Sequence, residues 1–292
     1  MAHAVVKLDE KQFAIPDGYA RHAKGYSRVS FIDHATSAAA VHMGHQMVQL
    51  EAGGYLEQCV LAYEKSLYVF EGEMDLMLDG RVYRMGVGDY ALILVGSAHA
   101  MRASSGSGAR WMEMIAPQPL AQSVGQDTFF VGAFDWPAKV ERFDKGDART
   151  RYVGHFEDGQ LPPPGNLQMD GYTGDGARLI SQKMMVDRNF GSAHMTMFVV
   201  EFAQGGGGSH HTHPFEESYY FVSGLADCEF EGRKYIVEPG TLCWTGVGAK
   251  HAIYTRGAEP LRFIETQTPQ PPARQAFRFD SEWRRMRERY PD

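Results

Sequence analysis

Residues 205–224 read GGGGSHHTHPFEESYYFVSG, and this stretch decides the fold. It places His211 and His213 two residues apart, with Glu217 four residues further on and a glycine at each end. Residues two apart on a β-strand face the same side, so the two imidazoles are expected to point into one space. His210 is expected to face the opposite side and to lie outside the set. The spacing predicts a cluster of ligand-type side chains on one strand.

A third imidazole comes from a second glycine-rich stretch, in which Gly240 is followed by Gly246, Gly248 and His251. Any single histidine in a β protein is more often a packed residue than a ligand. Four ligand-type residues at these spacings, framed by turn glycines, favour a metal site. Three nitrogens and one carboxylate oxygen suit Mn, Fe, Ni, Co, Cu or Zn better than Mg or Ca, and they leave coordination positions open. We therefore expect one divalent transition metal per chain, Mn, Fe, Ni or Zn, whose identity the ligand types leave open.

The chain repeats itself once, without gaps, at an offset of 152 residues. At this offset Tyr68 aligns with Tyr220, Gly72 aligns with Gly224, and many other identical residues align as well. The other matches include His42-Met43 on His194-Met195, Gly80-Arg81 on Gly232-Arg233, His99 on His251, Glu113 on Glu265, and Pro117-Gln118-Pro119 on Pro269-Gln270-Pro271. Two copies of one domain are the best account of this pattern.

Each copy consists of short β-rich runs broken by glycine turns every eight to twelve residues or so, which is typical of a small β-sandwich or barrel. Asp79-Gly80 and Glu231-Gly232 are expected at equivalent hairpin tips. The predicted domains are residues 1–136 and 166–292. The charged and proline-rich stretch 137–165 is expected to be a linker. A short amphipathic helix over 280–290 is expected to close the chain.

Composition narrows the classes of partner. The 292 residues include 29 Lys and Arg against 36 Asp and Glu, a net charge of −7 without a basic patch, so the sequence predicts no nucleic-acid partner. No run approaches the length of a membrane span, and the first residues lack the pattern of a signal peptide, so a cytoplasmic protein without a membrane partner is expected. The three cysteines are too few for a disulfide framework. A small-molecule substrate is the expected partner, and the sequence leaves homo-oligomerisation open.

The two glycine-framed stretches resemble the two motifs of the cupin superfamily. The spacing G-x5-H-x-H-x3-E-x6-G matches residues 205–224, and G-x5-P-x-G-x2-H-x3-N matches residues 240–255 with Gly246 and Thr255 at the proline and asparagine positions. The resemblance implies an all-β protein with two tandem cupin domains, each a jelly-roll barrel. It also implies that His211, His213, Glu217 and His251 bind the metal inside the second barrel.

The first copy has lost three of the four ligands. The positions 152 residues before the ligands hold Cys59, Leu61, Lys65 and His99. Leucine cannot coordinate a metal, and Lys65 would place a cation where the carboxylate belongs. The first barrel is therefore expected to hold no catalytic metal.

A bicupin with a degenerate first barrel and a metal in the second is similar to the (S)-ureidoglycine aminohydrolase family, which releases ammonia with manganese. In that family the positions of His211, His213, Glu217 and His251 carry Glu, His, His and Gln, and a lysine after the last barrel strand stands at the position of Gln267. The architecture therefore predicts a metal-dependent enzyme that acts on a small polar carbonyl, carboxylate or ureido metabolite, with a reaction other than ureidoglycine deamination. An Fe, Mn or Ni dioxygenase and a non-catalytic ligand-binding cupin are the alternatives.

Two side chains are the candidate acid or base groups. Tyr219 lies two residues beyond Glu217 and is expected to share its inward face, and Glu265 could serve if the last strand turns it inward. Packing or an external salt link is the alternative role for each. Because Glu265 and Arg262 recur in the metal-free copy, at Glu113 and Arg110, their recurrence favours a structural role.

Overall fold

The computed structural model describes residues 2–37, 39–103, 106–119, 127–147, 150–164, 177–271 and 277–279. The all-β prediction is confirmed, because every described element is a strand apart from two short 3-10 helices, η1 (Glu10–Gln12) and η3 (Asp158–Gln160). The predicted C-terminal helix over 280–290 lies outside the described residues. No helix in the described part of the chain is long and apolar enough to cross a membrane.

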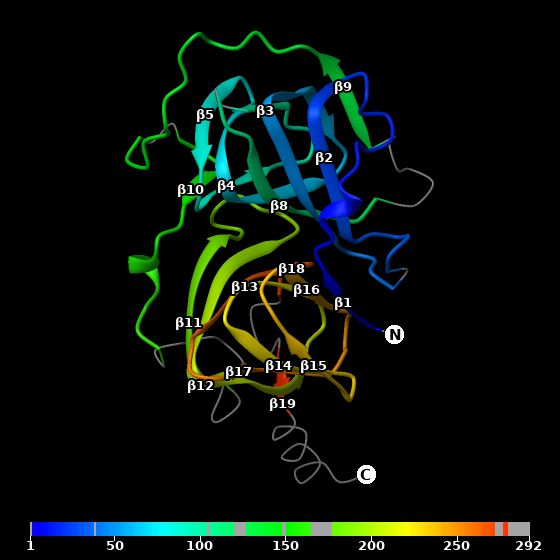
Figure 1. Cartoon of the computed structure of the whole chain (residues 1–292), viewed down its shortest axis with the longest axis vertical. Helices are drawn as coiled ribbons and strands as arrows, with labels where there is room; N and C mark the ends of the chain where they lie inside the picture. Colours follow the sequence, from blue (N-terminus) through cyan, green and yellow to red (C-terminus); the bar gives the residue numbers. More distant parts are fainter. Residues whose placement is uncertain are drawn as a thin grey trace. The chain divides into compact units, whose positions relative to one another are not determined.

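The first barrel is an antiparallel sheet of nine strands (Figure 1). Its ring closes through β3, β7, β4 and β8, since β3 pairs with both β7 and β8 and β4 pairs with the same two strands. The strands are β2 (Ala23–Ile32), β3 (Gly44–Leu61), β4 (Glu64–Leu78), β5 (Arg81–Gly86), β6 (Asp89–Ile93), β7 (His99–Ala103), β8 (Ala109–Ala116), β9 (Thr128–Gly132) and β10 (Val153–His155).

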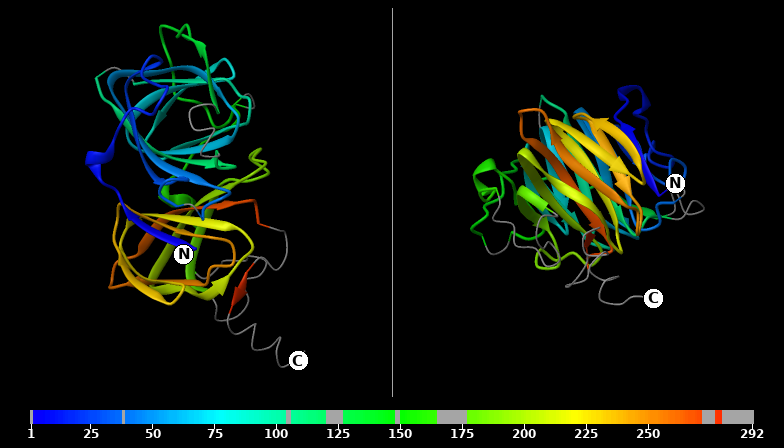
Figure 2. Two further views of the ribbon diagram at one scale, coloured as in Figure 1. Left: turned by 90° about the vertical axis from the view of Figure 1, so that its right-hand side faces the viewer. Right: turned by 90° about the horizontal axis from the view of Figure 1, so that it is seen from below.

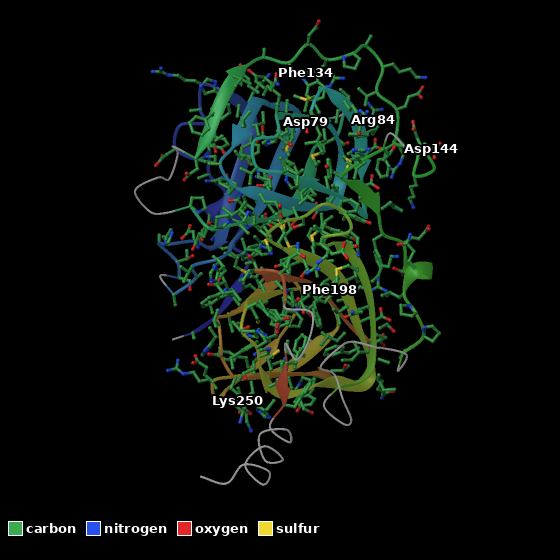
Figure 3. All side chains as sticks on the ribbon, turned by 180° about the vertical axis from the view of Figure 1, so that it is seen from behind. Asp79, Arg84, Phe134, Asp144, Phe198 and Lys250 are labelled. Atoms are coloured by element: carbon green, nitrogen blue, oxygen red, sulfur yellow. The ribbon has the colours of Figure 1, made fainter. Side chains whose placement is uncertain are left out.

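The second barrel is a sheet of ten strands, and the rings of strands can be followed in Figure 2. Phe198, labelled in Figure 3, belongs to its buried apolar core. The strands are β1 (His3–Lys7), β11 (Ala177–Val186), β12 (Thr196–Thr212), β13 (Glu216–Ser223), β14 (Leu225–Phe230), β15 (Arg233–Val237), β16 (Thr241–Thr245), β17 (His251–Arg256), β18 (Leu261–Thr268) and β19 (Arg278–Phe279).

The strand pairing repeats at the 152-residue offset. Cys59 pairs with His99 in the first barrel, and His211 pairs with His251 at the same place in the second. The two predicted hairpin tips are confirmed: Asp79-Gly80 joins β4 to β5, and Glu231-Gly232 joins β14 to β15. All four residues have positive φ, between 48° and 80°, as a two-residue turn matched to the strand twist requires.

The chain divides into two compact units, and each unit combines segments that are separate in the sequence. One unit comprises residues 1–8, 158–184 and 195–292, and the other comprises 9–157 and 185–194. β1 pairs with β16, so the first strand of the chain belongs to the second barrel. β10, within the stretch 137–165, pairs with β6 of the first barrel. Asp89 on β6 is fully buried and binds Arg142 and His155 from that stretch, at 2.8 and 2.7 Å.

His45 on β3 is a buried histidine of the first barrel, 1% exposed, and neither ring nitrogen has a hydrogen-bond partner among the described residues. Burial lowers the pKa of His45 to about 3. Below a pH of about 6.5 the unfolded chain binds a proton on His45, whereas the folded chain does not. As the pH falls from about 6.5 towards 3, the free energy of unfolding therefore decreases by up to about 1.4 kcal/mol per pH unit.

We expect His45→Leu to raise the free energy of unfolding of the first barrel, because the substitution removes a buried polar group without a partner. The gain is expected to be larger at pH 5 than at pH 8, since leucine also removes the proton linkage. Denaturant titration of the full chain at both pH values measures it. An equal gain at the two pH values would show that the buried ring titrates normally.

Candidate metal centre

The four predicted ligands lie together inside the second barrel. His211 lies at the end of β12, His213 directly follows that strand, Glu217 lies on β13 and His251 begins β17. One nitrogen or oxygen atom from each side chain lies within 4.8 Å of all the others. All four side chains are buried, with exposed fractions of 6% or less. The local sequence achieves this because the short turn after β12 returns the chain into β13.

Backbone carbonyls orient all three imidazoles. The Nδ1 atoms of His211, His213 and His251 lie 2.7, 2.8 and 2.9 Å from the carbonyl oxygens of Ser209, Phe215 and Ala249. A carbonyl only accepts, so each Nδ1 carries a proton, and Nε2 is the ring nitrogen left to face the cluster. This arrangement fixes the tautomer that metal-ligating histidines use.

The charges of the cluster also suit a cation. Burial lowers the pKa of His211 well below its usual value, and the neighbouring histidines lower it further, so this ring is neutral at neutral pH. Burial lowers the pKa of His251 in the same way. Burial opposes ionisation of Glu217, but His213 and hydrogen bonds hold the pKa of this carboxyl well below its usual range. Three imidazoles, two of them with lowered pKa values, and an ionised carboxylate form a donor set that fits a divalent transition metal.

Tyr219 and Glu265 both reach the cluster. The Tyr219 hydroxyl donates to Glu217 and lies 2.8 Å from Nε2 of His251. Glu265 lies opposite Tyr219 in the strand register, and burial followed by the charge of Glu217 raises its pKa well above the usual value. Glu265 therefore takes up a proton more readily than an exposed carboxyl does. Their assignment as catalytic groups stays a prediction.

Gln267 connects these carboxyl groups. Its Nε2 donates to Oε1 of Glu217 at 2.6 Å and to Oε1 of Glu265 at 2.8 Å. Its Oε1 accepts from the Thr196 hydroxyl at 3.2 Å. In the first barrel the paired positions are Gly44 and Ile115, which form no such bridge. The threonine and glutamine therefore accompany the complete ligand set, a signal that comparison of the two copies could have revealed.

Three phenylalanines that the sequence analysis missed form a buried cluster at the site: Phe215, Phe277 and Phe279. The ring of Phe215 stacks on the ring of His213, with centroids 4.0 Å apart. The ring centroids of Phe279 and His211 lie 5.1 Å apart. β19 pairs with the end of β12, which places Phe279 opposite His211. The alternation Phe-Arg-Phe at 277–279 is the sequence signal for this strand. These rings exclude water from one side of the cluster.

The first barrel holds an ion pair where the second holds the ligand set. The Nζ atom of Lys65 lies 3.1 Å from the Glu113 carboxylate, and both side chains are at most 2% exposed. The Trp111 indole donates to the same carboxylate at 2.9 Å. Cys59 and His99 lie 3.5 Å apart, and burial lowers the pKa of His99 to about 3.

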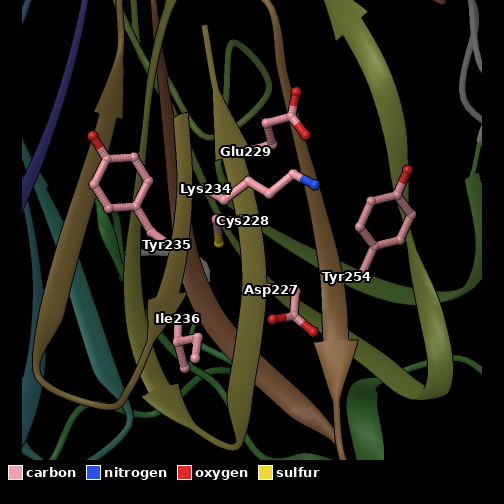
Figure 4. A pocket seen from close by; sticks show the side chains of 7 residues that line it. All are labelled: Asp227, Cys228, Glu229, Lys234, Tyr235, Ile236 and Tyr254. Atoms are coloured by element: carbon pink, nitrogen blue, oxygen red, sulfur yellow. The ribbon is translucent and has the colours of Figure 1, made fainter. Parts of the chain in front are cut away.

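A separate hollow of ≈ 530 Å³ lies on β14, β15 and β17 of the second barrel (Figure 4). Asp227, Ile236 and Tyr254 line it, and all three are exposed, so it lies on the outer face of the sheet. None of the residues that line it belongs to the ligand cluster.

Comparison with known proteins supports the fold. Residues 198–266 match the family model of the cupin domain. No curated protein sequence matches the chain. The formate complex of Lactobacillus farciminis oxalate decarboxylase superposes with a TM-score of 0.68 and 15% identity, over 99% of this chain and 93% of its own.

Two further solved structures agree. Bacillus subtilis oxalate decarboxylase has a TM-score of 0.65 at 14% identity, over 98% of this chain and 82% of its own. A Pseudomonas aeruginosa protein described as glyoxylate-induced has a TM-score of 0.64 at 19% identity, over 91% of this chain and 89% of its own. The predicted likeness to (S)-ureidoglycine aminohydrolase stays a prediction. The second barrel contains a cupin domain, and the chain has the fold of a bicupin.

Proposed function

We propose that the chain is a metal-dependent bicupin enzyme that binds one divalent transition metal through His211, His213, Glu217 and His251. The observation that carries this proposal is the convergence of three imidazole nitrogens and one ionised carboxylate in a buried space. Each ring is held by a backbone carbonyl, so little reorganisation is needed to receive a metal.

The substrate that suits this site is a small polar metabolite with a carbonyl, carboxylate or ureido group. A bound metal would supply a Lewis acid, and a redox centre if it is iron or manganese. Two of the structural neighbours are oxalate decarboxylases, one of them in complex with formate, which favours a small carboxylate. The buried phenylalanine cluster makes one side of the metal's surroundings apolar.

Tyr219 and Glu265 are the groups that could move protons. Gln267 donates to the Glu265 carboxyl and also to the Glu217 ligand. The Tyr219 hydroxyl lies against two of the ligands, so it would stand beside the metal. A substrate bound at the open coordination positions would therefore lie within reach of a proton donor.

The test is turnover by the protein reconstituted separately with Mn, Fe, Ni and Zn. Oxalate, glyoxylate, ureidoglycine, diketones and thiols form the substrate panel, with carbon dioxide, ammonia and oxygen uptake as readouts. Turnover of a small carboxylate, carbonyl or ureido compound without oxygen uptake is expected. Stoichiometric oxygen uptake would show a dioxygenase instead. Binding without turnover in every metal form would show a ligand-binding protein.

We expect Tyr219→Phe to keep the metal and to lower kcat about 10²- to 10⁴-fold, because the substitution removes one hydroxyl and no ligand. Steady-state kinetics and metal content are measured on the same preparation. Tyr254→Phe, on the exposed outer face of β17, is the matched control and should change neither. Full activity of Tyr219→Phe would remove this residue from the catalytic groups.

A further inference from the structure

The end of the first barrel that corresponds to the metal-bearing end of the second is polar. Arg28 and Tyr63 stand where the second barrel has Ile180 and Phe215, 152 residues later. Ile180 and Phe215 are buried apolar residues of the second barrel. Thr128 pairs with Leu61, which holds the position of His213 in the repeat. In the second barrel the neighbour of His213 at this place is Phe277. The first barrel has thus replaced apolar packing by a cation and hydroxyls.

These polar groups line a cavity of ≈ 300 Å³ in the first barrel. Tyr19, Arg28, Tyr63 and Thr128 contribute to its wall. The Tyr19 hydroxyl lies 3.1 Å from that of Thr128, which Tyr63 also contacts by a hydrogen bond. Tyr19 and Tyr63 are at most 5% exposed. The cavity is therefore a built polar site, large enough for a small metabolite.

Arg28 supplies the cation among the residues that line this cavity. It lies over the Tyr19 ring, 5.4 Å from the centroid. Among the residues that the structure describes, it forms no ion pair and no side-chain hydrogen bond with a carboxylate. The deeper cation, Lys65, is already neutralised by Glu113. A guanidinium offers a planar fork of donors that matches a carboxylate.

Two further polar atoms have no partner in the described residues. The Tyr26 hydroxyl is buried without a hydrogen bond, and Tyr26 itself is only 1% exposed. Its ring stacks on Tyr19 with centroids 5.7 Å apart, next to the cavity. Oδ2 of Asp127 is also buried without a partner, and Asp127 lines the cavity. Asp17 lines it as well but is exposed. A buried polar atom without a partner is costly, and a ligand in the cavity would satisfy Oδ2 of Asp127.

We propose that the first barrel binds a small organic carboxylate that also carries an O–H or N–H donor. The carboxylate pairs with Arg28 and accepts from the tyrosine hydroxyls. The donor of the ligand reaches Oδ2 of Asp127, an acceptor that a simple carboxylate would leave unsatisfied. Because this site uses no metal ligand, its occupancy is independent of the metal centre in the second barrel.

Titration calorimetry of the full chain tests the proposal, with glycolate, acetate and the uncharged glycolamide as probes, before and after chelation of metal. Glycolate is expected to bind most tightly, acetate more weakly and glycolamide weakest. Binding is expected to survive chelation, which separates this site from the metal centre. Arg28→Met should weaken glycolate binding at least tenfold, and Tyr63→Phe should weaken it by a smaller factor. Arg21→Met, an exposed arginine of the same barrel, is the matched control and should bind glycolate like the wild type.

Two results would overturn the proposal. One is the absence of millimolar or tighter glycolate binding by the chelated wild-type chain. The other is wild-type affinity in both Arg28→Met and Tyr63→Phe, with circular dichroism confirming that the variants are folded. The first result includes glycolate binding that disappears on chelation, which would place the ligand on the metal.

Discussion

Replacing Glu217 by alanine is expected to weaken metal binding more than about 100-fold, because removal of a ligand should exceed the 10- to 100-fold effect of losing an outer-shell partner. Glu217 is the anionic member of the cluster, and its Oε2 lies 2.7 Å from Nε2 of His213 and 3.4 Å from Nε2 of His251. The barrel itself should remain folded, because its apolar core does not include this side chain. Elemental analysis after dialysis, with circular dichroism as the folding check, measures the effect.

The matched control for that experiment is His99→Ala. His99 holds the position of His251 in the first barrel and is fully buried. It faces Cys59 instead of a set of ligands, so its removal should leave the metal content unchanged. Retention of metal by Glu217→Ala, or its loss from His99→Ala, would place the metal elsewhere.

Replacing Lys65 by methionine is expected to destabilise the first barrel by about 3–5 kcal/mol, because the substitution leaves the buried Glu113 carboxylate without its cation. The double variant Lys65→Met with Glu113→Gln should recover most of that loss, since it removes both charges together. Denaturant unfolding of the full chain, followed by tryptophan fluorescence, measures the transition that includes Trp111.

The control for this ion pair is Lys139→Met. Lys139 pairs with Glu141 on the surface, with side chains 82% and 72% exposed, and its removal should not measurably change stability. If Lys65→Met were as stable as the wild type, the ion pair would not be what stabilises the first barrel at the place where the second barrel has its ligand set.

Local spacing was enough to predict the cluster of ligand-type side chains. Residues 211 and 213 share a face because side chains on a strand alternate with a period of two. The 152-residue repeat aligns Cys59 with His211 and His99 with His251, and in the strand register of the structure Cys59 lies opposite His99 as His211 lies opposite His251. The turn glycines were equally predictable from the sequence. Gly72 has a φ of 70°, and a Cβ there would lie 1.9 Å from the carbonyl oxygen of Gly108. β4 runs through this glycine as one strand from Glu64 to Leu78, with a register shift between Val69 and Glu71, whereas the sequence predicts short β-rich runs broken at glycine turns.

Features that depend on distant partners were not predictable from local pattern. β1 pairs with β16, more than two hundred residues away, and nothing in residues 3–7 specifies that neighbour. The sequence indicated that Lys65 stands where a ligand carboxylate belongs, but its pairing with Glu113 depends on the register between β4 and β8. The link from Gln267 to Glu217 and Glu265 likewise depends on side-chain geometry across β13 and β18.

The most direct test of the central claim, a single metal held inside the second barrel, is the metal stoichiometry of the purified wild-type chain together with the position of the metal in an anomalous-scattering crystal structure. One divalent transition metal per chain is expected, coordinated by Nε2 of His211, His213 and His251 and by the Glu217 carboxylate. Two metals per chain, no metal after reconstitution, or a metal bound in the first barrel beside Lys65 would contradict the account.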